Sequence, residues 1–195
     1  MKPSLFALAL FFASLWAADP VAAQSQAPAP GDDYKKFVAQ LVTPENLADC
    51  ISKMDGIIDQ SERLSALDQG ATHGVNAETN IGLHLAFCIF TNKEEVLYYL
   101  IISRDGQDLS PAAAVNLAAL FCDRAGLPHP VSVTEGEKPI FYVQWHIRHS
   151  DWHAMKKKML EVRAVNRAEK DPQKAFVAAI MSENNARQVN SFGGP

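Results

Sequence analysis

Residues 141–148 read FYVQWHIR, and this stretch decides the fold. Its odd positions are apolar, from Phe141 to Ile147, whereas the side chains between them are polar or amphipathic: Tyr142, Gln144, His146 and Arg148. Successive side chains of a β-strand point to opposite faces, so a period of two predicts a strand with one buried and one solvated face. The sequence therefore predicts a sheet that is covered on one side.

Two runs upstream predict a β-hairpin of the same sheet. Residues 81–89 and 96–102 are rich in β-branched and aromatic side chains, and a short polar turn separates them. Both faces of each run are apolar, so a pair of buried helices is the alternative. Residues 131–133 form a second hairpin with the strand at 141–148, across a turn at 136–138.

Helical periodicity flanks these strands. The expected helices span residues 34–41, 44–56, 111–125, 150–162 and 172–181. Gly56 and Gly126 are the expected stops, whereas residues 57–80 are ambiguous, with a short strand at Ile57 as one alternative. We predict an α+β fold, an antiparallel sheet of two hairpins flanked by helices, as a single domain over residues 32–188 with a flexible tail at 189–195.

The N-terminus carries an export signal. Residues 1–23 combine a lone lysine, an apolar run from Leu5 to Ala18 and small residues before Gln24, a pattern typical of a secretory signal peptide. The apolar run is shorter than the ~20 residues of a membrane-spanning helix. Residues 24–31 form a linker rich in proline and alanine. We expect a protein without a transmembrane segment that is periplasmic or secreted from a bacterial-type envelope.

Composition and charge restrict the partners. Of 195 residues, 48% are hydrophobic and 21% charged, which excludes a disordered or collagen-like chain. The net charge of -4 gives no reason to expect a nucleic acid partner. Residues 32–68 hold eight acidic and four basic side chains, and residues 148–170 hold seven basic and three acidic ones. These segments are expected to attract each other or to present faces of opposite sign.

Three cysteines follow the predicted signal peptide: Cys50, Cys88 and Cys122. An odd number in an oxidising compartment allows at most one intramolecular disulfide, between two of the three. Each lies among apolar neighbours, which also fits buried structural thiols. No Cys-x-x-Cys motif points to redox chemistry.

One histidine cluster suggests metal chemistry. His146, His149 and His153 would share one face if the whole stretch were a helix, and three imidazoles suit a zinc-like metal. The predicted strand at 141–148 separates His146 from the other two, and no His-Glu-x-x-His motif occurs. No cofactor is expected, and a zinc-like metal is the alternative.

Aromatic side chains suggest a protein partner. Tyrosine and tryptophan anchor protein interfaces, and they gather in the predicted strands and the helix that follows. The candidate contact residues are Tyr142, Gln144, His146, Trp152 and Lys156.

Several stretches carry a resemblance to a known family. They are Thr43-Pro44-Glu45-Asn46-Leu47-Ala48, the hairpin at 81–102, Asn116 in the central helix, and the strand-to-helix passage at 141–160. With the order of elements, they resemble the YbjN-like family and the related type III secretion chaperone-like fold over residues 43–165. The chain lacks an asparagine-tryptophan-asparagine sequence in the central helix and has additional terminal helices. The resemblance implies a non-enzymatic binding module, often dimeric, that presents a sheet or helix face to a protein.

The sequence therefore predicts an exported, non-enzymatic protein-binding or chaperone-like module whose partner is another protein or a second copy of itself. Two alternatives remain: a small metal-dependent hydrolase that uses the histidine cluster, and an inhibitor or immunity protein for a secreted toxin. No catalytic residue stands out, since no nucleophile motif or phosphate-binding loop is present.

Overall fold

The computed structural model describes residues 32–67, 73–104, 109–129, 133–136 and 140–192. The predicted signal peptide and linker lie outside these residues. The helices and strands, in chain order, are α2 (Asp32–Leu41), α3 (Pro44–Leu67), β1 (His73–Glu78), β2 (Leu83–Thr91), β3 (Glu95–Arg104), α4 (Pro111–Ala125), β4 (Thr134–Glu135), β5 (Ile140–Arg148), α5 (His149–Asn166) and α6 (Pro172–Phe192). The predicted α+β arrangement is confirmed.

The sheet is antiparallel throughout, with strand order β1-β2-β3-β5-β4. β2 and β3 form the predicted first hairpin. The short β4 pairs with β5, but it spans Thr134–Glu135 and not the predicted 131–133, of which residues 131 and 132 lie outside the described part of the chain. β3 lies between β2 and β5, so Tyr98 has Ile89 on one side and Trp145 on the other. The side chains of β5 alternate between buried and exposed as the period of two predicts.

Three boundaries differ from the sequence-based expectation. α3 does not stop at Gly56 but continues to Leu67, because Ile57, Ile58 and Ser61 extend its buried stripe. The ambiguous segment does contain a strand, but at His73–Glu78 rather than at Ile57. At the C-terminus α6 extends through Phe192, into the segment expected to be a tail.

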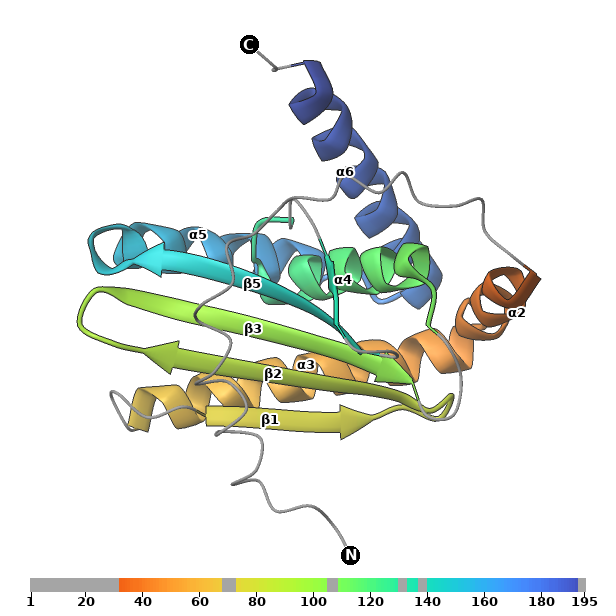
Figure 1. The fold of residues 1–195 in the computed structure, drawn as a ribbon, viewed down its shortest axis with the longest axis horizontal. Coiled ribbons are helices and arrows are strands. Elements are labelled where there is room, and N and C mark those ends of the chain that lie inside the picture. The colour runs from red at the N-terminus through yellow and green to blue at the C-terminus, as the bar shows by residue number, and fades with distance from the viewer. Residues whose placement is uncertain (1–31, 68–72, 105–108, 130–132, 137–139, 193–195) are drawn as a thin grey trace, which may run out of the picture.

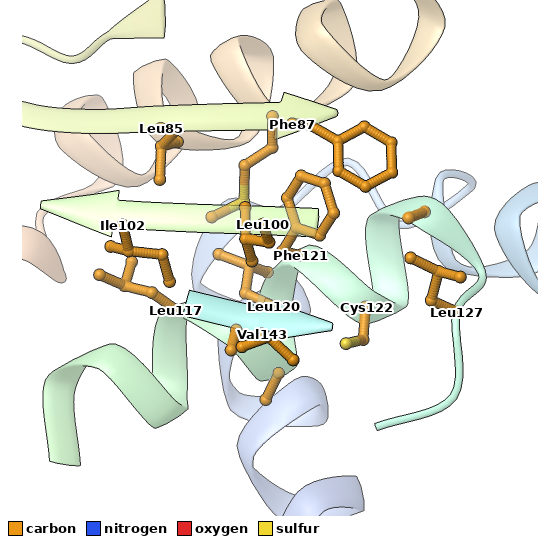
Figure 2. Close-up of a cluster of buried hydrophobic side chains, with 14 of the residues drawn as sticks. Leu85, Phe87, Leu100, Ile102, Leu117, Leu120, Phe121, Cys122, Leu127 and Val143 are labelled. Atoms are coloured by element: carbon orange, nitrogen blue, oxygen red, sulfur yellow. The ribbon is translucent and has the colours of Figure 1, made fainter. Parts of the chain in front are cut away.

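The core lies between one face of the sheet and the helices α3, α4 and α5, which pack on that face (Figure 1). Figure 2 shows the central part, where Leu117, Leu120 and Phe121 of α4 lie beneath strand residues such as Phe87 and Leu100. The rings of Phe87 and Phe121 are 4.9 Å apart between centroids. A continuous apolar layer of this kind fixes the helices to the sheet.

Both ends of α4 follow the sequence signals. The Ser110 side chain accepts a hydrogen bond from the Ala113 N–H, and Pro111 begins the helix. Gly126 ends it with a φ of 73°, in the left-handed region. A side chain at Gly126 would collide with the backbone of Met159, so the glycine lets α5 pack closely against the end of α4.

Within the described residues, no helix is both long enough and apolar enough to cross a membrane.

Candidate functional site

One face of the sheet is not covered by any helix that the structure describes. We call this the open face and define it by three adjacent rows of opposed side chains that cross β2, β3 and β5; a fourth row, His84–Ser103–Ile140, lies at its end. The three defining rows are Phe90–Leu97–His146, Cys88–Tyr99–Gln144 and Ala86–Ile101–Tyr142. Its centre is apolar, because β2 and β3 contribute mostly apolar and aromatic side chains, and its border on β5 is more polar.

The side chains of the open face differ in their exposure to solvent. Leu97 is only 2% exposed, although it points away from the main core. Tyr99, Ile101 and Tyr142 are half-buried, and Ile140 at the end of β5 is 41% exposed. The open face is therefore an apolar surface with a partly buried centre.

The polar border of the open face is held by side-chain contacts. His146 Nδ1 lies 3.1 Å from the Glu95 carboxylate, and His146 Nε2 lies 3.4 Å from the Gln144 amide oxygen. A row of mutually bound polar side chains along an apolar strip is the usual pattern of a binding surface and its rim.

The structure divides the predicted contact residues between two places. Tyr142, Gln144 and His146 lie together on the open face, on alternate positions of β5. Trp152 and Lys156 lie in the helix layer on the other side of the sheet, where they line a cleft. The single contact surface expected from the sequence is thus two separate surfaces.

The cleft is lined by the turn between β2 and β3 and by the start of α5. Both elements lie at the same end of the sheet (Figure 1). Its volume is about 640 Å³, and its walls come from the end of α3, the hairpin and the first two turns of α5. Trp152 packs on Tyr98 with ring centroids 5.8 Å apart, and the Lys156 ammonium lies 5.5 Å from the centre of the Trp152 ring.

The three histidines of the predicted metal site separate in the same way. His146 is on the open face, whereas His149 and His153 line the cleft. His149 donates from Nε2 to the Asn92 carbonyl oxygen at 2.6 Å, which ties the start of α5 to the hairpin turn. Among the described residues, no three His, Cys, Asp or Glu side chains are grouped so that they could hold a metal ion.

No disulfide joins any two of the three cysteines, all of which are described residues. Cys50 and Cys122 are buried in the core, whereas Cys88 faces the opposite side of the sheet. Burial, with a smaller contribution from Asp49, raises the pKa of Cys50 to about 12, and burial also raises the pKa of Cys88. Both thiols therefore favour the protonated, unreactive form.

The acidic and basic segments of the sequence meet in an ionic seam between α3, α4 and α5. We define the seam by three carboxylates and three guanidinium groups: Asp55, Asp59, Glu62, Arg124, Arg163 and Arg167. Arg163 binds Glu62 through two hydrogen bonds of 2.9 and 2.6 Å, and Arg124 binds Asp55 through two of 2.9 and 2.5 Å. The predicted attraction between the two segments is confirmed as contacts within the fold.

The seam also covers the end of α4. Arg163 donates to the Ala125 carbonyl oxygen, Arg167 to that of Arg124, and Asn166 to that of Asp123. These carbonyls lie in the last turn of α4, where cations are favoured. Burial lowers the pKa of Arg163, but the hydrogen bonds and charge of Glu62 outweigh this effect, so its pKa is raised. The seam is thus a structural clamp with its charges paired.

Sequence reasoning did not find the cleft as a site. Its walls combine residues near 62, 92 and 152, which are far apart in the chain, and no local pattern brings them together. The signals in the sequence were two pairs with a spacing of four, Trp152 with Lys156 and His149 with His153, and this spacing places each pair on one face of a helix.

No protein-family model matches this chain, and no curated protein or solved structure is significantly similar to it. The resemblance to the YbjN-like family therefore stays a prediction. The open face and the cleft, rather than any relative, are the basis for assigning a function.

Proposed function

We propose that this protein is an exported, non-enzymatic binding module that holds an apolar segment of another polypeptide against its open face. The observation that carries the proposal is the set of three cross-strand rows on β2, β3 and β5, with no described helix over them. Apolar surface in contact with water is unfavourable, and contiguous exposed patches in soluble proteins commonly mark interaction sites.

The composition of the open face supports a protein as the partner. Phe90, Tyr99 and Tyr142 supply large aromatic surfaces from three neighbouring strands, and aromatic residues are enriched at interface centres. His146 and Gln144 add hydrogen-bonding groups at the border, where they can orient a bound chain. The one thiol on the described part of this face, Cys88, has a pKa that burial raises, so binding suits the face better than nucleophilic catalysis.

A photo-crosslinking experiment in the exporting cell tests this proposal. The photoreactive residue p-benzoyl-phenylalanine replaces Ile101 at the centre of the open face, and in a matched variant it replaces Val165, which is 72% exposed on α5. We expect a crosslinked species of defined mass from position 101 and none from position 165. Mass spectrometry of the uncrosslinked chain should show that it begins at Gln24, as the predicted signal peptide requires.

A substitution that introduces a negative charge on the open face provides the second test. Tyr142→Asp is expected to reduce the crosslinking yield from position 101 about tenfold, because a desolvated carboxylate opposes an apolar contact. A partner mass equal to this chain would identify a homodimer. Crosslinks of equal yield from positions 101 and 165, or crosslinks only to residues 24–31 of the same chain, would contradict the proposal.

A further inference from the structure

The cleft in the helix layer is a second candidate binding site, separate from the open face. It lies on the opposite side of the sheet, and its volume of about 640 Å³ falls within the ~300–1,000 Å³ of small-molecule sites. Its walls come from α3, the β2–β3 hairpin and α5, which are fixed to one another by the core and by the ionic seam. The cleft is therefore already formed before any ligand enters.

The floor of the cleft is apolar and aromatic. Ile89, Val96 and Tyr98 are buried strand residues whose side chains reach the cleft, and Trp152 covers Tyr98 from α5. Trp152 itself is half-buried, so part of its ring remains available to a ligand. This floor favours an aliphatic or aromatic body.

The rim of the cleft is basic. Lys93 on the hairpin turn and Lys156 on α5 are exposed, and within the described part of the chain neither forms an ion pair with a carboxylate. His153 adds a third nitrogen-bearing side chain to this rim. Unpaired ammonium groups beside an apolar floor attract an anionic group that stays at the solvent edge.

Glu62 is the one acidic side chain in the lining, and its charge is already engaged. Arg163 binds both of its carboxylate oxygens, at 2.9 and 2.6 Å. The carboxylate therefore contributes little net repulsion against an anion at the Lys93 and Lys156 side of the cleft.

We propose that the cleft binds a small organic carboxylate, with its apolar body against Trp152, which is itself supported by the buried Tyr98, and its carboxylate between Lys93 and Lys156. Lysine ammonium groups on flexible stems suit a single compact charge rather than the bidentate recognition that arginine provides. This site extends the protein's function beyond the protein-binding face and does not depend on it.

Titration with decanoate tests the proposal, with decanol as the neutral probe of the same length. The readout is the NMR signal of the two tryptophan indole groups in the folded domain. The Trp152 indole lies in the cleft, whereas the Trp145 indole donates to the Pro128 carbonyl oxygen at 2.9 Å and serves as an internal reference. We expect a saturable shift of the Trp152 signal with one decanoate per chain, no shift of the Trp145 signal, and at least fivefold weaker binding of decanol.

Neighbouring lysines on α5 give a matched pair of variants. Lys156 lines the cleft, and Lys157, the next residue, is also exposed but does not line it. We expect Lys156→Gln to weaken decanoate binding about fivefold, and Lys157→Gln to leave it unchanged. The variant Lys93→Gln should weaken binding to a similar extent.

Three results would overturn the proposal: equal affinity for decanoate and decanol, equal loss in Lys156→Gln and Lys157→Gln, or no saturable shift of Trp152. A membrane surface offers the same chemistry, so vesicles of phosphatidylglycerol form a separate arm. We expect them to leave the Trp152 signal unchanged, and a Trp152 shift with vesicles but not with decanoate would also overturn the assignment to a free carboxylate.

Discussion

The two halves of α5 carry similar basic side chains in opposite surroundings. At the C-terminal end, Arg163 and Arg167, the residue that follows the last residue of the helix, bind carboxylates of α3 and carbonyl oxygens of α4. In the N-terminal half, Lys156 extends over the Trp152 ring at the edge of an open cleft. One half of the helix is thus fixed by its charges, and the other half exposes them.

This difference separates structural charges from binding charges. The guanidinium group of arginine forms several hydrogen bonds in one plane, which suits a clamp that satisfies two carboxylate oxygens and a backbone carbonyl together. An exposed lysine contributes little to folding and stays available to a ligand. The ionic seam therefore holds charges that are paired within the fold, whereas the cleft carries ammonium groups that stay exposed.

Removing a charge from the paired half should have the largest effect. Arg163→Ala is expected to lower the free energy of unfolding by about 3 kcal/mol, because it leaves the partly buried Glu62 carboxylate and the buried Ala125 carbonyl oxygen without their partner. Urea denaturation followed by circular dichroism measures the change.

The control for this prediction is Arg148→Ala. Arg148 pairs with Asp151 at 3.3 Å, but its side chain is 82% exposed against 9% for Arg163. A change below about 0.5 kcal/mol is expected there. If both variants lost the same free energy, burial would not distinguish the clamp from an ordinary surface ion pair.

Much of this architecture could be predicted from local patterns. The period of two at residues 141–148 predicts β5, and the Ser110-Pro111 and Gly126 signals predict both ends of α4. The unequal charges of the two segments predicted their attraction, which is the ionic seam. These features depend on residues that are adjacent in the chain, or on the total charge of a segment. Both can be read from one sequence.

Other features depend on packing that no local pattern records. Gly56 is an ordinary stop signal, yet α3 continues because Ile57 and Ile58 gain burial beneath the sheet. β1 has few strand-forming residues, and its pairing with β2 makes it a strand. The cleft requires three distant segments to meet, so only the fold reveals that Trp152 and His146 belong to different surfaces.

An intermediate effect is expected at Tyr98 of β3, which packs on Trp152 in the N-terminal half of α5 and interacts electrostatically with Arg163 in the C-terminal half. Burial raises the pKa of Tyr98, the charge of Glu62 raises it further, and Arg163 opposes the rise. A group with a raised pKa in the folded state contributes full stability below its unfolded pKa of about 10, and loses it as the pH rises above that value. Between pH 9 and pH 11 the wild-type protein should lose about 1 kcal/mol of unfolding free energy that Tyr98→Phe retains.

Urea denaturation of both proteins at the two pH values gives this difference directly. Cys50, Cys88 and Tyr99 also have raised pKa values, but they titrate in both proteins and cancel in the comparison. If the wild type and Tyr98→Phe lost the same free energy of unfolding between the two pH values, Tyr98 would ionise as easily in the folded state as in the unfolded chain.

The smallest effect is expected in the exposed half of α5. Lys156→Gln should change the free energy of unfolding by less than about 0.5 kcal/mol, because the ammonium is exposed and its one described contact is with the Trp152 ring. The same denaturation experiment used for Arg163→Ala measures it. A loss above 1 kcal/mol would mean that Lys156 is part of the structural clamp. A small loss of unfolding free energy together with weaker decanoate binding would show that the Lys156 charge acts on a ligand and not on the stability of the fold. The two halves of the helix would then differ in the role of their charges.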